Sequence, residues 1–248
     1  MKWLSKLFMK RSNWSIPYLI FLIIFVVLPL VLIFLYAFQD AEGNFTMANF
    51  AKFISSPEAA NTFVYSIGVA IITTLFCIVL GYPAAYILSN RSLCRSRVMV
   101  VLFILPMWIN ILVRTLATVA LFDFIKVPLG EGALIFGMVY NFLPFMILQI
   151  HTSLCKMDYF LLQASADLGA NPAQDLGASP TKVFTKVVVP LSMPGVMSGI
   201  MMVFMPTIST FAIAELLTMN NIKLFGTTIQ ENINNGMWNY GAALSLIM

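Results

Sequence analysis

The chain has 248 residues, of which 60% are hydrophobic and 10% are charged, and its formal net charge is +4. Soluble domains carry about 25% charged residues, so the composition excludes an ordinary water-soluble domain and indicates a protein that lies mostly in lipid. The small positive balance gives no support to nucleic-acid binding. Cys77, Cys94 and Cys155 show no metal-ligand spacing and are expected to be reduced thiols.

Six apolar runs in chain order predict an all-α, polytopic membrane protein. Each of the first five is long enough to cross a hydrocarbon layer roughly 30 Å thick, at about 1.5 Å of rise per residue. The first run is too long for a signal-peptide core and is expected to stay as an anchor. The sixth is expected to be incomplete, because a spanning helix needs roughly 20 residues. The predicted spans are 16–38, 62–88, 98–122, 133–152, 187–214 and 238–248, within one transmembrane domain of residues 1–248.

The charges between the runs alternate in kind. Lysines and an arginine precede the first run, and Arg91, Arg95 and Arg97 join the second run to the third without an acidic neighbour. The loops after the first and third runs contain acidic residues. Because Lys and Arg mark cytoplasmic loops, the pattern places the N-terminus and residues 156–186 on the cytosolic side.

The longest polar interruption, residues 156–186, contains one octad twice, as DLGANPAQ and DLGASPTK. Gly169 and Gly177 can each end a helical turn in the left-handed conformation. Asn171–Pro172 and Ser179–Pro180 each place a capping residue before a proline, which favours a helix start. The residues therefore predict short helices on the cytosolic surface, in either an ordinary solvated loop or a docking device.

This segment resembles the signature loop of the inner-membrane permease subunits of bacterial ABC importers. That loop reads EAA, three residues, Gly, nine residues, an apolar residue, one more, then Leu-Pro. Gln163-Ala164-Ser165 takes the EAA position before Gly169, whereas the second half fits from Gly177 to Pro190, so the spacing leaves open which octad docks. The resemblance implies a coupling helix between spans four and five that contacts a separate ATP-hydrolysing subunit. The coupling residues so implied are Gln163, Ala164, Gly169, Asp175, Gly177 and Pro190.

Further stretches extend the resemblance over most of the chain and narrow it to the polyamine branch of the family, which imports spermidine and putrescine. They are LPMWINILVRTLA (105–117), GMVYNFLPFMIL (137–148), VVVPLSMPGVMSGIM (187–201) and WNYGAALSLIM (238–248). The resemblance implies a type I ABC importer permease bundle in the bacterial inner membrane. It also implies a second permease subunit in a heterodimer, an ATPase dimer, an extracytoplasmic binding protein and a polyamine substrate.

No nucleotide-binding or catalytic motif accompanies these features. The chain lacks GxxxxGK[ST], HExxH and a serine elbow, which argues against an intramembrane enzyme. We therefore expect a non-catalytic subunit without a cofactor or a metal site, with ATP bound by the partner. Two other interpretations stay open: a permease for another small solute such as thiamine, sulfate or ferric iron, and a channel or scaffold without an ATPase.

A few polar and aromatic residues near the ends of the runs are candidates for the substrate pathway. The Glu215 carboxylate either attracts a polycation or ends a helix at the interface. Trp108 and Tyr140 can offer ring faces to an alkylammonium, although aromatic residues also gather at membrane interfaces. Asn110 should seek a partner inside a bundle. Arg114 either snorkels to the outer interface or shapes an outer gate or a docking surface for the binding protein.

The fifth run contains a GxxxG pair, Gly195 and Gly199, which predicts close packing against another helix. Several methionines share this run. They are more typical of adaptable packing than of a metal site.

Overall fold

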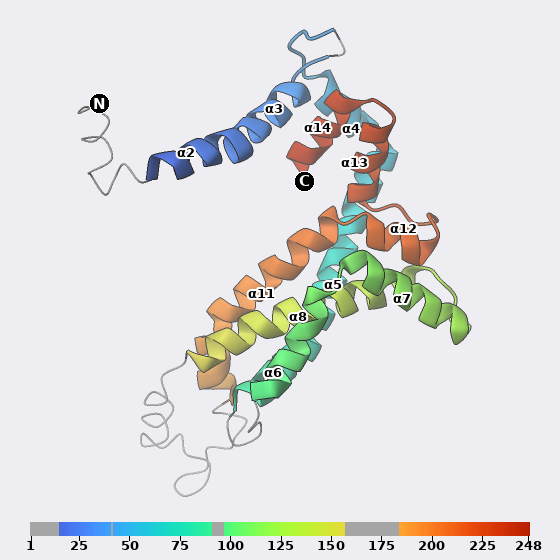
Figure 1. The fold of residues 1–248 in the computed structure, drawn as a ribbon. Coiled ribbons are helices and arrows are strands. Elements are labelled where there is room, and N and C mark those ends of the chain that lie inside the picture. Colours follow the sequence, from blue (N-terminus) through green and yellow to red (C-terminus); the bar gives the residue numbers. More distant parts are fainter. Residues whose placement is uncertain (1–14, 41, 91–96, 157–183) are drawn as a thin grey trace, which may run out of the picture. The chain divides into compact units, whose positions relative to one another are not determined.

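The computed structural model describes residues 15–40, 42–90, 97–156 and 184–248 (Figure 1). Within them every regular element is a helix, and the only extended pairing is one bridge between Gln39 and Phe45. The chain separates into two compact units. Unit 1 comprises Met1–Asn61 and Thr228–Met248, and unit 2 comprises Thr62–Thr227. The single domain predicted for residues 1–248 stays a prediction.

The described residues form a few long helices and a larger number of short ones. Four stretches of the described residues are long and apolar enough to cross a membrane: Ile16–Ala37, Pro57–Ser89, Glu131–Cys155 and Val189–Ser209. The elements are α2 (Ile16–Leu22), the π-helix η2 (Ile23–Val27), α3 (Leu28–Ala37), α4 (Ala48–Ser55), α5 (Pro57–Ser89), α6 (Arg97–Ile104), the 3-10 helix η3 (Leu105–Trp108), α7 (Ile111–Phe124), α8 (Glu131–Cys155), the π-helix η5 (Phe184–Val188), α11 (Val189–Ser209), α12 (Ala212–Thr218), α13 (Phe225–Asn234) and α14 (Trp238–Ile247).

The third predicted span is not one straight helix. Val98–Trp108 and Ile111–Phe124 together have the length and composition of a span, but they meet at an angle of 93° (Figure 1). Ile109 has an extended backbone, and the Asn110 side-chain oxygen accepts a hydrogen bond from the Leu112 amide at 2.8 Å. A side-chain cap of this kind starts a new helix. The stretch predicted as the third span, residues 98–122, is therefore broken at Ile109.

In the part of the chain that the structure describes, each of the two π-helical segments ends two residues before a proline. η2 comes before Pro29, and η5 comes before Pro190. Proline has no backbone N–H, and its ring collides with the carbonyl of the residue four positions earlier in an α-helix. The wider π turn accommodates that ring, so both helices continue past the proline.

The centre of unit 2 is the pair formed by α8 and α11, which lie side by side (Figure 1). A Cβ atom at Gly199 would lie 2.5 Å from the Met146 Sδ, and one at Gly195 would collide with the Ser153 side chain. The close packing predicted from the GxxxG pair is thus confirmed. Because position 195 faces 153 and position 199 faces 146, the two helices run antiparallel.

Unit 1 is held together around the end of α3. The helix α14 packs on α3 and on α4. The Asn49 amide donates hydrogen bonds to the carbonyls of Ala37 and Gln39, at 3.0 and 2.9 Å, and Asn239 donates to the same Gln39 carbonyl at 2.8 Å. These three bonds fix both short helices against the last turn of the first span.

Candidate functional site

The bend between η3 and α7 positions two of the predicted pathway residues. Trp108 ends η3 with 85% of its side chain exposed. Asn110 is also exposed, but its side-chain oxygen is engaged in capping α7. Asn110 therefore bonds to the backbone of its own helix, and a partner for it inside a bundle stays a prediction.

Arg114 does not snorkel. Its side chain is only 5% exposed, and its Cζ lies 5.9 Å from the centre of the Tyr140 ring on α8. Tyr140 comes nine residues after Glu131, about 14 Å along the helix, so the Arg114 guanidinium lies beside the first half of α8 and not at its start. Its Nε and Nη1 atoms have no hydrogen-bond partner among the described residues.

The residue after Tyr140 on α8, Asn141, is a second buried polar group. Asn141 is completely buried, and its Nδ2 donates to the Gly137 carbonyl at 2.8 Å. Its Oδ1 has no partner within the described part of the chain. Buried polar groups with unused hydrogen-bonding capacity are rare in folded proteins, and each calls for an explanation such as water or a ligand.

The helix α12 brings Glu215 to the same part of unit 2, because it packs on both α7 and α8. Gly137 permits this approach, since a Cβ there would collide with the Leu217 side chain of α12. Glu215 is half-buried in the first turn of α12, where the helix dipole favours a carboxylate. We call Trp108, Asn110, Arg114, Tyr140 and Glu215 the α7–α8–α12 group.

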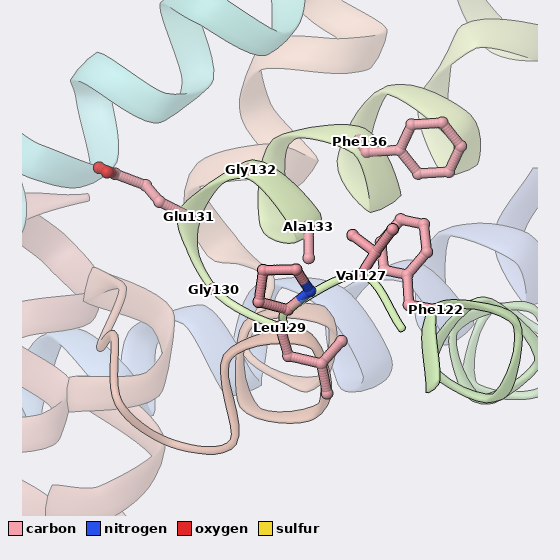
Figure 2. Close-up of a pocket in the computed structure, with 9 residues that line it drawn as sticks. Phe122, Val127, Leu129, Gly130, Glu131, Gly132, Ala133 and Phe136 are labelled. Carbon is pink, nitrogen blue, oxygen red and sulfur yellow. The ribbon is translucent and has the colours of Figure 1, made fainter. Parts of the chain in front are cut away.

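An apolar pocket of about 490 Å³ lies between the end of α7 and the start of α8 (Figure 2). Glu131 turns away from this cavity, and its Oε1 accepts a hydrogen bond from the Tyr65 hydroxyl at 2.6 Å. The pocket therefore offers no free carboxylate to a cation. Its lining consists of Phe122, Val127, Pro128, Leu129, Gly130, Glu131, Gly132, Ala133 and Phe136.

The other end of the α8–α11 pair adjoins the predicted coupling loop. Since the two helices are antiparallel, the chain leaves α8 at Cys155 and returns at η5 on the same end of unit 2. The Phe184 ring packs edge-on against Tyr82 and Tyr86 of α5, and the hydroxyls of Tyr82 and Ser192 lie 2.7 Å apart. Pro190 is the exposed second residue of α11. The other implied coupling residues, Gln163, Ala164, Gly169, Asp175 and Gly177, lie outside the described residues.

Sequence reasoning missed two contacts made by tyrosines: the Tyr65 hydroxyl donates to Glu131, and the Lys52 Nζ lies 4.4 Å from the centre of the Tyr240 ring. No motif or periodicity connects residues so far apart in the chain. The start of α7, in contrast, had a signal: Asn110 is a preferred N-cap residue placed directly before an apolar helix. Among the described residues, no group of three or more His, Cys, Asp and Glu side chains could hold a metal ion.

The fold and the site define a class of protein. Several apolar helices surround buried polar and charged side chains, which in membrane proteins mark pathways for solutes or ions. Residues 77–248 match the family of binding-protein-dependent transport system inner membrane components. The chain belongs to this family, as the resemblance of its loop predicted, and it is a multi-pass inner-membrane component of a transport system.

Curated relatives resemble the chain over nearly its whole length. The spermidine/putrescine transport system permease protein PotB of Escherichia coli is 30% identical over 92% of this chain and 88% of its own length. The proteins of that name from Salmonella typhimurium and Haemophilus influenzae are 30% and 31% identical, over 92% and 91% of this chain and 84% of their own lengths.

Proposed function

We propose that the chain is the permease subunit of an ATP-driven importer for polyamines such as spermidine and putrescine. The observation that carries this proposal is the 30–31% identity over at least 91% of the chain with permeases of that named specificity. In the complex, a second permease forms the other half of the pathway, a dimer of ATPase subunits lies beneath, and a binding protein delivers substrate from outside.

The coupling to the ATPase runs through residues 156–186. The antiparallel α8–α11 pair supports this assignment, because both ends of the segment meet one packed part of unit 2. Closure of the ATPase dimer pushes the segment, and η5 passes the movement to α11 directly and to α5 through Tyr82 and Tyr86. Gln163, Ala164, Gly169, Asp175, Gly177 and Pro190 make the contacts with the ATPase in this proposal.

Four residues of the α7–α8–α12 group line the substrate pathway, namely Trp108, Asn110, Tyr140 and Glu215. Glu215 supplies a negative charge and Trp108 supplies an exposed ring. Asn141, which follows Tyr140 on α8 and lies outside the named group, supplies a buried oxygen as an unused acceptor. An alkylammonium is attracted to each of these groups. One face of the Tyr140 ring is already engaged by Arg114, so Tyr140 positions Arg114 besides offering its other face. The N-terminus lies in the cytosol, as the charge pattern of the loops predicts.

Reconstitution of the whole complex tests the function. The chain is placed in lipid nanodiscs with a second permease and the ATPase subunits of the same organism, and ATP hydrolysis is measured with the binding protein present. Spermidine should stimulate hydrolysis severalfold, whereas sulfate at the same ionic strength should not. Glu215→Gln should weaken the stimulation, because it removes the carboxylate and keeps the shape of the side chain.

Three results would contradict parts of this proposal. Stimulation by sulfate and not by spermidine would exclude the polyamine substrate. Failure to co-purify with an ATPase would exclude the coupled permease, and ion conductance of the chain alone would indicate a channel. Deletion of residues 167–174 separates the octads: loss of ATPase binding shows that the first copy docks, and unchanged transport shows that the second one does.

A further inference from the structure

A positively charged side chain of unit 1 lies on an aromatic ring. The Lys52 Nζ is 4.4 Å from the centre of the Tyr240 ring and 3.9 Å from the Met237 Sδ. Lys52 is exposed, whereas Tyr240 is only 8% exposed. An ammonium within about 6 Å of a ring centre is attracted by the negative face of the ring. The ring and the sulfur thus form a small cation site that the chain itself occupies.

This site is built by groups other than Lys52. Tyr240 belongs to α14, which packs on α3 and α4, and the neighbouring Asn239 donates a hydrogen bond to the Gln39 carbonyl. Gly241 packs closely on Ile233, where a Cβ would lie 2.7 Å from the Ile233 Cγ1. Lysine, in contrast, carries its charge on a flexible four-carbon stem. The ring therefore keeps its place when the lysine swings away.

The site lies where a cation from outside would arrive. Asn239 and Asn49 both bind the Gln39 carbonyl just beyond α3, so the site is level with the end of the first span that the proposed orientation places outside. Acidic residues outnumber lysines in the segments on that side, which concentrates cations there. These acidic residues are Asp40, Glu42, Glu58, Asp123, Glu131, Glu215 and Glu231, and the lysines are Lys52, Lys126 and Lys223.

We propose that the Tyr240 ring and the Met237 sulfur form a binding site for a primary alkylammonium, and that Lys52 is its built-in competitor. The lysine ε-ammonium and the terminal ammonium of a polyamine are the same group, an NH₃⁺ on a methylene chain. The incoming ammonium displaces Lys52 from the ring. This inference rests on the proposed function for its substrate class. An exposed cation–π contact shifts an equilibrium by only about two- to fivefold, so Lys52 tunes the affinity and does not block the site.

Transport kinetics test the competition in the reconstituted complex. Lys52→Gln should lower the KM for spermidine about two- to fivefold at unchanged kcat, because the ring becomes free. Lys52→Arg keeps a cation on the ring and should not lower KM. Lys126→Gln is the matched control, since it removes a positive charge from the same side of the membrane at a residue whose described partner is Asp123.

Combining Lys52→Gln with substitutions of Tyr240 distinguishes an effect of the ring from a general effect of charge. Tyr240→Phe preserves the aromatic face and should preserve the effect of Lys52→Gln. Tyr240→Leu removes the face and should abolish that effect. The proposal is overturned if Lys52→Gln leaves KM unchanged, if Lys126→Gln lowers KM equally, or if the effect of Lys52→Gln persists in the Tyr240→Leu background.

A binding measurement distinguishes failure of this site from failure of the proposed function. Reductive ¹³C-methylation keeps the charge of lysine, and the Lys52 methyl resonance is assigned by its loss in Lys52→Arg. Spermidine at millimolar concentration should shift this resonance toward those of unstacked lysines, and sodium chloride of equal ionic strength should not. A shift without spermidine import would refute the function and keep the site. Import without a shift would refute the site alone.

Discussion

Two apolar helical stretches of the chain show opposite patterns of burial. Within Ile16–Ala37 of unit 1, none of the residues in an apolar stretch of 18 is buried. In the corresponding stretch of 18 residues within Glu131–Cys155 of unit 2, 56% of the residues are buried. The first stretch consists almost wholly of large apolar residues. The second contains Gly137, Asn141 and Pro144, and the structure buries all three.

The difference shows what an apolar sequence means in a membrane protein. Lipid tails are as apolar as leucine, so a helix gains little by turning a leucine inward. Small and polar residues are the ones that must find partners or close neighbours. In this chain they, and not the large apolar residues, identify the helices of the core, namely α8 with Asn141 and α11 with Gly195 and Gly199.

The largest contrast is expected from truncating one leucine in each stretch. Leu134→Ala in α8 leaves a cavity beside a fully buried position and should cost about 2–5 kcal/mol. Leu30→Ala in α3, where the side chain is 61% exposed, should stay within about 0.5 kcal/mol. Thermal unfolding in detergent measures both, since each kcal/mol is about 2–4 °C for a chain of this size. Equal losses would contradict the difference in burial.

The next effect is expected from filling the contact between α8 and α11. Gly195→Leu places a side chain where Ser153 and the Gln149 carbonyl already lie, so it should cost at least about 1–3 kcal/mol. Met197→Leu, two residues further along the same helix and half-exposed, is the control and should be neutral. The measurement is the fraction of each variant that stays monodisperse in detergent after heating, compared between Gly195→Leu and Met197→Leu. A stable Gly195→Leu variant would show that the helices separate easily.

The buried arginine predicts a gain in stability. Arg114→Met removes two buried nitrogen atoms that lack partners in the described part of the chain, and it should stabilise the isolated subunit by about 1–3 kcal/mol. Arg114→Lys keeps a buried charge and should give no gain. The midpoint of thermal unfolding, measured for both variants and for the unsubstituted subunit, tests this expectation. A less stable Arg114→Met subunit would mean that water or lipid satisfies the guanidinium.

The smallest of these effects belongs to unit 1, whose packing is concentrated at the end of the first span. Asn49→Ala removes two hydrogen bonds to backbone carbonyls and should cost about 1–2 kcal/mol. Asn44→Ala, at an exposed residue of the same segment, should cost less than about 0.5 kcal/mol. Proteolysis of the segment between α3 and α5 reports this loosening directly. No change in either variant would place the stability of unit 1 elsewhere.

Sequence reasoning succeeded for the long apolar helices and for the glycine pair, because each depends on a local run or on a spacing within one helix. It did not locate the break in the third run, because composition alone cannot distinguish a straight span from a pair of helices bent at Ile109. For Arg114 it left two alternatives open, snorkelling to the interface or shaping an outer gate or docking surface, and the burial of this residue excludes the first. The depth of that residue depends on the direction of α7, and this direction is set by the break and by the Asn110 cap.

The sequence by itself determined that this chain lies in a membrane and where its main helices run. It also identified the transport family, because the polar loop and the stretches that resemble this family are local signals. Only the tertiary structure decided which polar groups come together, such as Arg114 with Tyr140 and Lys52 with Tyr240. The reason is physical: side chains distant in sequence meet only when helices bend and pack, and no local pattern encodes the angle between two helices.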